Sequence, residues 1–176
     1  VLFYNTRLFK EAGLDPDRPP TSWEELVQYG QKLTKQEAGR FSQTGLDTDY
    51  YSIVLETMMF QAGVGQMYDS DLTQALFNTP EALKALTFMT DLTTRYGIED
   101  PEFNSQDNTF ALELTAMALA HPVSMGTFRL FNPALEYKVA LAPPVEAGDV
   151  PATTGTHWQY FITKKAPHMA AQKWVE

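Results

Sequence analysis

Side chains that could do chemistry gather in the short stretch GTHW at residues 155–158. Thr156, His157 and Trp158 stand directly before or within WQYFITK, an apolar run of strand length at 158–164. A loop that carries an imidazole and an aromatic ring at the mouth of a strand either faces a ligand or caps the edge of a core. The rest of the chain has to decide between these two interpretations.

Nucleophilic catalysis is one chemistry that the chain could attempt. It holds three histidines, His121, His157 and His168, and a serine, Ser124, within PVSMG. The nucleophile elbow of α/β hydrolases follows G-x-S-x-G, and the chain has Pro122 where the first glycine is required. Because cysteine is absent, thiol nucleophiles, disulfides and cysteine-bound zinc are excluded. We expect no enzyme, although a hydrolase that uses Ser124 and a histidine stays an alternative.

Two acidic pairs, DTD at 47–49 and DSD at 69–71, resemble calcium ligands. An EF-hand loop that begins at Asp69 needs glycine at its sixth position and glutamate at its twelfth. The chain has Gln74 and Pro80 there. Acidic pairs of this kind are more typical of turns, so we expect no metal and no cofactor.

The composition indicates an acidic globular protein with one core. Its 176 residues are 44% hydrophobic, and 13 basic against 22 acidic residues give a net charge of −9. No cluster of lysine and arginine is present, which argues against a nucleic-acid partner. No window approaches the roughly 20 apolar residues of a membrane span, so we expect no insertion into a bilayer. The chain begins with VLFYN and without an initiator methionine, which suggests a piece of a longer polypeptide.

Interleaved strand and helix patterns predict an α/β domain with a parallel or mixed sheet. Ser22 and Glu25 form a capping box at one helix start, and Thr79 with Pro80 opens another. In such sheets, ligands bind beyond the carboxyl ends of the strands. Strands are expected at 1–5, 116–120, 137–143 and 158–164, and helices at 6–13, 22–33, 49–62, 79–96, around 128–131 and from Pro167 onward.

Four segments carry motifs in a fixed order along nearly the whole chain. They are FYNTRLFKEAGLDPDRPPTSWEEL, FQAGVGQMYDSDLTQALFNTPEALKALTFMTDLTTRYG, FALELTAMALAHP and ITKKAPHMAAQKW. Together they resemble the sugar-binding family of bacterial extracellular solute-binding proteins, which serve ABC importers. The third segment is similar to the family's F-x-x-G-K-A-A-M stretch, which leads to G-P-W.

The chain departs from the family pattern in two places. Glu113 and Leu114 stand where the family usually shows Gly-Lys, and HPV at 121–123 stands where it often shows Gly-Pro-Trp. The proline matches and the tryptophan does not, so a frequent sugar-stacking ring is absent from this loop. His121 or Ser124 would supply a polar contact instead, and a buried structural histidine is the alternative for His121.

The resemblance implies an architecture and a set of partners. It implies a type II periplasmic-binding-protein lobe, with three α/β/α layers and a mixed sheet. Residues 1–147 would form the second lobe, 148–155 a hinge crossing, and 156–176 a strand and helix that return toward the first lobe. A sugar or oligosaccharide would be captured between the lobes and passed to a membrane permease, in a periplasmic or extracellular, membrane-associated protein. A ligand-binding sensor module stays a further alternative.

The chemistry of a sugar suggests which residues would bind it. A pyranose presents an apolar face to an aromatic ring, and its hydroxyl groups need donors and acceptors once water is expelled. Tyr51 is also a candidate for the core, because it belongs to the apolar stripe of its helix. The predicted ligand-binding residues are Asp49, Tyr50, Tyr51, His121, Ser124, Thr156, His157 and Trp158.

Overall fold

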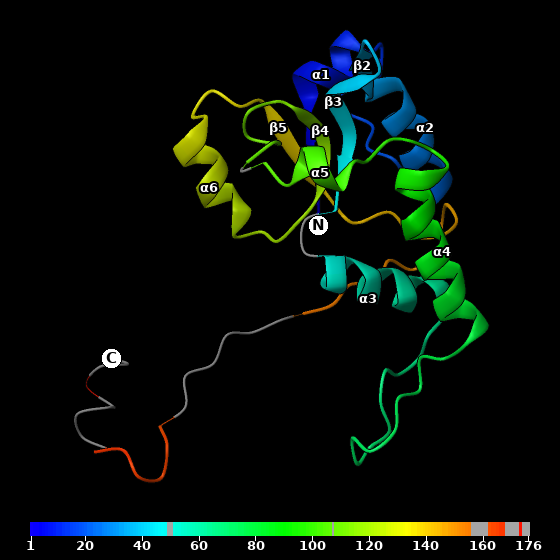
Figure 1. Ribbon diagram of the computed structural model, residues 1–176, viewed down its shortest axis with the longest axis vertical. Coiled ribbons are helices and arrows are strands. Elements are labelled where there is room, and N and C mark those ends of the chain that lie inside the picture. The colour runs from blue at the N-terminus through cyan, green and yellow to red at the C-terminus, as the bar shows by residue number, and fades with distance from the viewer. Residues whose placement is uncertain (49–50, 107, 156–161, 168–172, 174–176) are drawn as a thin grey trace.

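The computed structural model describes residues 1–48, 51–106, 108–155, 162–167 and Lys173. Helices and strands alternate along this part of the chain (Figure 1). The strands are β1 (Leu2–Asn5), β2 (Lys35–Glu37), β3 (Arg40–Asp47), β4 (Thr115–Leu119) and β5 (Tyr137–Ala140). The helices are α1 (Thr6–Glu11), α2 (Trp23–Leu33), α3 (Tyr51–Ala62), α4 (Pro80–Thr94), α5 (Pro101–Asn104) and α6 (Ser124–Phe131).

The strands of the described chain form one mixed sheet in the order β2-β3-β4-β1-β5. β3 pairs with β4 in parallel, whereas β1 is antiparallel to both β4 and β5. Leu2 at the start of β1 faces Leu119 on one side and Ala140 on the other. The strands β3, β4 and β5 therefore run in the same direction and end at one edge of the sheet.

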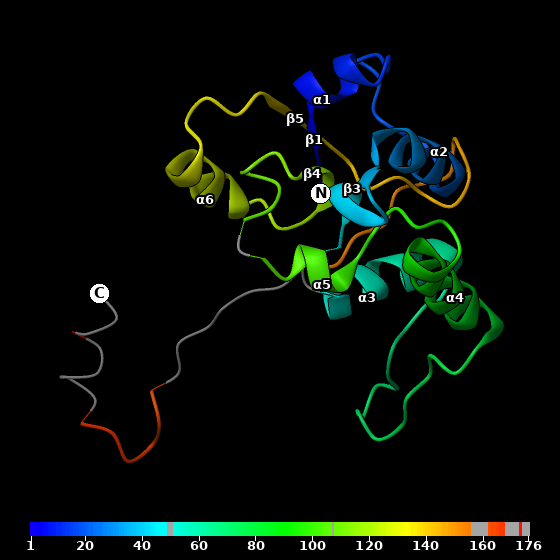
Figure 2. The ribbon, with the colours of Figure 1, turned by 45° about the horizontal axis from the view of Figure 1, so that its top comes forward.

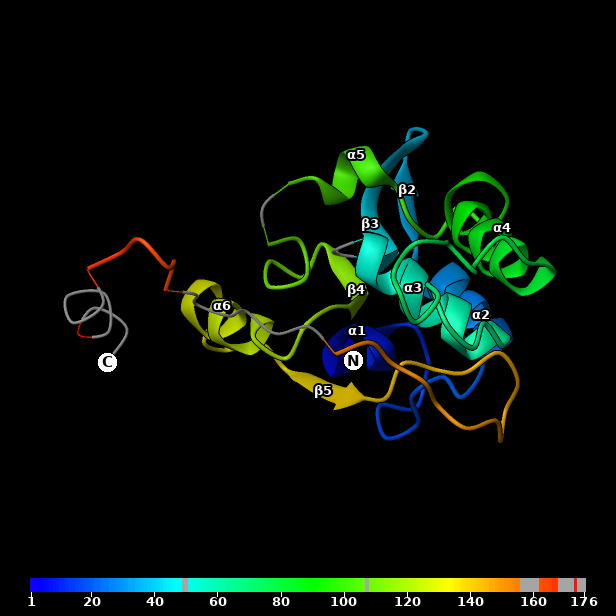
Figure 3. The ribbon, with the colours of Figure 1, turned by 90° about the horizontal axis from the view of Figure 1, so that it is seen from below.

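Helices cover both faces of the sheet, which gives three layers. Along β1 the side chains alternate: Leu2 and Tyr4 join the larger hydrophobic cluster, and Phe3 joins the smaller one. The larger cluster includes side chains of α1, α2, α3 and α4, and the smaller includes Phe128 of α6. Figure 3 shows α6 on one side and the α2, α3 and α4 group on the other. The predicted α/β/α arrangement with a mixed sheet is confirmed.

Helix starts follow the predicted caps. The side-chain oxygen of Ser22 accepts a hydrogen bond from the backbone nitrogen of Glu25 at 3.2 Å. Glu25 in turn accepts from the backbone nitrogen of Thr21 at 2.9 Å, one residue earlier than a standard capping box. Thr79 caps α4 through the nitrogen of Ala82 at 3.3 Å, and Pro80 opens that helix. These caps orient the helices that pack on the larger cluster.

The strands β2 and β3 and the helix α5 have no counterpart in the sequence prediction. The strand β3 was not predicted because it buries polar side chains. The hydroxyl of Thr44 lies 2.8 Å from that of Thr115 on β4 and donates to Oδ1 of Asn104 at 2.8 Å. These contacts satisfy the threonine inside the sheet, so an apolar pattern is not required.

The segment between α3 and α4 projects away from the body (Figures 1 and 2). It contains an isolated antiparallel bridge between Tyr68 and Ala75. The carboxylate of Asp69 accepts from the backbone nitrogens of Thr73 and Gln74 at 2.6 and 2.9 Å. The DSD pair therefore begins with a turn-forming aspartate, as predicted.

The C-terminal predictions fall largely outside the described residues. Of the predicted strand 158–164, residues 158–161 are not described, and 162–164 belong to no strand. The helix expected from Pro167 onward lies outside the described residues except for Lys173. Among the described helices, none is long and apolar enough to cross a membrane.

Candidate functional site

The edge where β3, β4 and β5 end carries the candidate site. The loop after β4 begins at Ala120. Thr48 follows β3, and α3 begins three residues later at Tyr51. Figure 3 looks toward this edge and shows α3 lying across it. In α/β proteins, ligands bind outside the carboxyl ends of strands in this way.

A polar pocket lies at the ends of β3 and β4 on the α6 face. Its volume is about 360 Å³, within the range of small-molecule sites. Among the described lining residues, the loop between α5 and β4 supplies half of the polar side chains. The polar side chains that line it include Asp47, Asn104, Asn108, Thr109, Ser124 and Thr127.

Two of these side chains, Asn104 and Thr109, form hydrogen bonds with residues of strand β3. The amide of Asn104 donates to the carbonyl oxygen of Leu46 at 3.0 Å and accepts from Thr44 at 2.8 Å. The hydroxyl of Thr109 donates to Oδ2 of Asp47 at 3.3 Å. The orientation of the amide and the carboxylate is therefore set by the sheet, as a binding site requires.

Two aromatic residues line the polar pocket together with the polar groups. The rings of Phe110 and Phe128 are both buried, with centroids 4.8 Å apart. Phe3 packs edge-on against Phe128 at 5.1 Å. The pocket thus combines buried aromatic rings with hydroxyl, amide and carboxylate groups, and the polar groups could form hydrogen bonds with the hydroxyl groups of a sugar.

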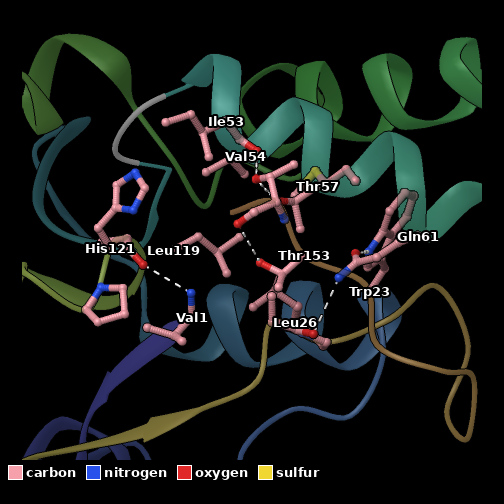
Figure 4. A pocket seen from close by; sticks show the side chains of 16 residues that line it. Val1, Trp23, Leu26, Ile53, Val54, Thr57, Gln61, Leu119, His121 and Thr153 are labelled. Carbon is pink, nitrogen blue, oxygen red and sulfur yellow. Dashed lines mark hydrogen bonds between the residues drawn. The ribbon is translucent and has the colours of Figure 1, made fainter. Parts of the chain in front are cut away.

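An apolar pocket lies on the opposite face of the end of β4. Its volume is about 200 Å³, and α2, α3 and the segment after β5 surround it. His121 lies at one end, and Gln61 and Trp23 lie at the other (Figure 4). The Gln61 side chain accepts from Nε1 of Trp23 at 3.0 Å. The polar groups here therefore largely bind protein partners.

The segment after β5 closes the apolar pocket. Gln61 donates to the carbonyl oxygen of Ala152 at 3.2 Å, and the hydroxyls of Thr57 and Thr154 are 3.0 Å apart. The backbone nitrogen of Trp23 donates to the carbonyl oxygen of Pro144 at 3.0 Å. Both helices α2 and α3 thus hold this segment.

The structure places three of the predicted ligand residues in three different pockets. His121 is half-buried and lines the apolar pocket, and Ser124 begins α6 and lines the polar pocket. Tyr51 begins α3, is 46% exposed, and lines a groove between α3 and α4. The remaining predicted residues, Asp49, Tyr50, Thr156, His157 and Trp158, lie outside the described residues.

Sequence reasoning missed the residues that make up most of the polar pocket. The signal was present as NSQDNT at 104–109, an uninterrupted polar run between Phe103 and Phe110. Asp47 was interpreted only as a turn former, because β3 was not predicted. Knowledge of that strand would have put Asp47 at its carboxyl end.

The electrostatics of the two pockets favour an uncharged ligand. Among the described residues that line them, none is lysine or arginine, and Asp47 faces the polar pocket. The described residues contain no cluster of three or more histidine and acidic side chains that could hold a metal ion. The site therefore offers hydrogen-bonding and packing surfaces.

Comparison with known proteins places this architecture in a class. The model of the family described as bacterial extracellular solute-binding protein matches residues 1–176. The chain belongs to this family, and the resemblance drawn from its motifs is confirmed. The family is one of substrate-binding proteins.

Individual relatives are similar over part of their length. The sn-glycerol-3-phosphate-binding periplasmic protein UgpB of Escherichia coli K12 is 35% identical over 104 residues, 52% of this chain and 22% of that protein. An ABC transporter solute-binding protein of Thermotoga lettingae, bound to α-D-tagatose, has a TM-score of 0.72 and 32% identity, over 84% of this chain and 39% of its own. The cyclic α-maltosyl-1,6-maltose binding protein of Arthrobacter globiformis has a TM-score of 0.67 and 30% identity, over 84% of this chain and 37% of that protein.

These likenesses show that the fold is that of the type II periplasmic binding proteins. The chain spans less than half the length of each of these relatives.

Proposed function

We propose that the parent protein is the substrate-binding component of an ABC importer and captures a sugar or oligosaccharide between two lobes. The observation that carries this proposal is the polar pocket at the ends of β3 and β4, which hydroxyl, amide and carboxylate groups line together with Phe110 and Phe128. Membership in the family supports it, and so does similarity to a solute-binding protein with bound tagatose and to one named for binding cyclic α-maltosyl-1,6-maltose.

The ligand class follows from charge. UgpB is named for binding sn-glycerol 3-phosphate, a ligand with an anionic phosphate group. A phosphate dianion requires cationic or backbone donors, and a carboxylate close to it is unfavourable. The polar pocket presents Asp47 and, among its described residues, no lysine or arginine. A neutral polyhydroxy ligand fits these groups better than a phosphate ester does.

The lobe boundaries remain as the sequence predicted them. Residues 1–147 form the second lobe in this proposal, 148–155 form the hinge crossing, and 156–176 return toward the first lobe. The bonds from Gln61 to Ala152 and between Thr57 and Thr154 support a crossing at 148–155, because they hold its end against α3. Closure of the lobes would rotate about this segment.

Partners and location follow from this role. The closed, loaded protein would dock on a membrane permease, and the parent would be periplasmic or extracellular and associated with the membrane through that contact. The relative UgpB is named as periplasmic. Binding and delivery need no covalent chemistry, so the protein is not an enzyme in this proposal.

A thermal-shift screen of the full-length protein tests the ligand class. A ligand that binds only the native state stabilises it by mass action and so raises the melting temperature. At a ligand concentration of 100 times the dissociation constant, the added stability is about 2.7 kcal/mol. We expect a shift with at least one mono- or oligosaccharide and none with sn-glycerol 3-phosphate. A shift with the phosphate ester alone would overturn the assignment to neutral sugars.

A further inference from the structure

Glu99 is a carboxyl group buried where the end of β3 meets the start of α3. Its side chain is 1% exposed. The preceding residue, Ile98, accepts hydrogen bonds at its carbonyl oxygen from the nitrogens of Gly45 and Leu46, at 2.9 and 3.0 Å. The segment that carries Glu99 is therefore fixed against β3 by the backbone.

The carboxyl group contacts both sides of the junction. Its Oε1 accepts from the backbone nitrogen of Thr48 at 2.9 Å and from the hydroxyl of Thr48. Thr48 directly follows β3, and Tyr51, whose phenol also interacts with Glu99, is the first residue of α3. One side chain thus joins the strand end to the helix start.

The second carboxyl oxygen sets the protonation state. Oε2 of Glu99 is buried, and within the described part of the chain it has no hydrogen-bond partner. A buried charge with one oxygen unpartnered is unfavourable, and protonation of the carboxyl group removes that charge. Burial accordingly raises the pKa of Glu99, against the opposing hydrogen bonds from Thr48 and Tyr51.

Among the described residues, few titratable groups surround Glu99. Tyr51 faces it from α3, and the pKa of Tyr51 is raised by burial first and then by the charge of Glu99. Thr48 at the end of β3 and Thr93 on α4, the other side chains in this network, are neutral. On its own segment, Asp100 caps α5 by accepting from the nitrogen of Phe103 at 2.7 Å. No cation among the described residues contributes to the shift of Glu99.

We propose that Glu99 is a positioning residue of the ligand site, whose neutral carboxyl group holds the end of β3 against the start of α3. The inference rests on the proposed function. Asp47, which lines the polar pocket, directly precedes Thr48, and Thr57 of α3 lines the apolar pocket. Ionisation of Glu99 favours opening of the junction to water, which displaces Asp47 and weakens ligand binding.

The direction of the pH dependence follows from linkage. The ordinary pKa of this group is 4.5, and the closed junction raises it. The closed form therefore binds the proton more tightly than the open form does. Its stability is fully present below the ordinary pKa and falls as the pH rises through the raised value. Ligand affinity that depends on the closed form falls over the same pH window.

Amide exchange of Thr48 in the full-length protein tests the inference without any ligand. We compare the wild type with Glu99→Gln, Glu99→Ala and, as a control, Glu102→Gln at a nearby exposed glutamate. Protection of the Thr48 amide is measured relative to that of Thr34, which bonds to Gly30 in α2. Exchange is measured at pH 5 and at pH 8, and we expect wild-type protection to be about tenfold lower at the higher pH, the effect of one lost hydrogen bond.

The variants separate charge from packing. Glu99→Gln keeps a neutral acceptor for Thr48, so the Thr48 amide should be protected equally at both pH values. Glu99→Ala removes the acceptor, so protection of the Thr48 amide should be about tenfold lower than in Glu99→Gln at both pH values. Glu102→Gln should follow the wild type. The same pH profile in the wild type and in Glu99→Gln would overturn the inference, and so would wild-type protection in Glu99→Ala.

Calorimetric titration with D-tagatose and with maltotriose adds the functional readout. The affinity of the wild type should weaken toward pH 8, and that of Glu99→Gln should not. If Thr48 exchange depends on pH but the affinity of the wild type does not, Glu99 stabilises the fold without affecting ligand binding. That result would contradict its role in the site. If no sugar binds the wild type, the proposed function fails, and the exchange of Thr48 still decides whether Glu99 holds the junction.

Discussion

Glu113 shows how a single residue departs from the family pattern and what replaces the usual glycine. Its backbone φ is +61°, in the left-handed region that favours glycine. Its Oε1 accepts from Nδ2 of the fully buried Asn5 at 3.0 Å and from Nε of Arg7 at 3.1 Å. Asn5 also caps α1 through the nitrogen of Leu8. The strained glutamate thus satisfies a buried amide that a glycine would leave without this partner.

Two substitutions at Glu113 separate strain from hydrogen bonding. Both Glu113→Ala and Glu113→Gly should lower the free energy of unfolding, because Asn5 loses an acceptor in each. Glu113→Gly should be more stable than Glu113→Ala by about 1 kcal/mol, since glycine adopts a positive φ without a steric penalty. Urea unfolding at pH 7 measures the difference. Equal stabilities for the two variants would show that the backbone of Glu113 is not strained.

The sequence could offer individual candidates for the site but could not show which of them the fold brings together. His121 and Ser124 are three residues apart and were both predicted to contact ligand, yet they line pockets on opposite faces of β4. Their separation arises because α6 begins at Ser124 and turns toward the smaller hydrophobic cluster. Such a change of face depends on tertiary packing, which residue types and spacing do not encode locally.

At the scale of elements, prediction succeeded where burial is apolar and failed where it is polar. The buried apolar runs of β1 and β4 and the capped helices α2 and α4 were all predicted, and so was β5, which is half-buried or exposed. β3 was not, because Gln43 and Thr44 are buried as hydrogen-bonded polar residues. Its position also depends on Gly45, which allows α2 to approach the strand closely. A close approach between a helix and a strand cannot be recognised from the sequence of the helix or of the strand alone.

Replacing Gly45 tests that close approach. A methyl group at Gly45 would lie 2.2 Å from the carbonyl oxygen of Gly30, which is backbone and cannot move aside alone. Gly45→Ala should therefore lower the free energy of unfolding by about 1–3 kcal/mol. The control is Gly126→Ala in α6, where the methyl group meets nothing within 4 Å. Because alanine favours the helix over glycine, this substitution should raise the free energy of unfolding by about 0.5–1 kcal/mol. Thermal unfolding compares them, and an unchanged melting temperature for Gly45→Ala would contradict the packing of α2 on β3.

At the scale of the whole molecule, the proposed function gives this chain one side of the binding site between two lobes. The motifs identified the family and the type II lobe from the sequence, because they recur in order along the chain. The ligand could not be identified in this way, because a sugar bound between lobes contacts both of them. What the structure adds is a polar pocket at the carboxyl ends of β3 and β4, with two buried aromatic residues and without cationic side chains among its described residues.

Calorimetric titration of the full-length protein and its Asp47→Asn variant tests most directly whether this pocket binds the sugar. The titrant is the saccharide with the largest thermal shift, and Asp71→Asn on the exposed segment between α3 and α4 is the matched control. A carboxylate that accepts from a sugar hydroxyl forms a charge-assisted hydrogen bond, so Asp47→Asn should weaken binding by about tenfold or more. Asp71→Asn should bind as the wild type does. Undiminished affinity in a folded Asp47→Asn variant would contradict the claim that the polar pocket holds the sugar.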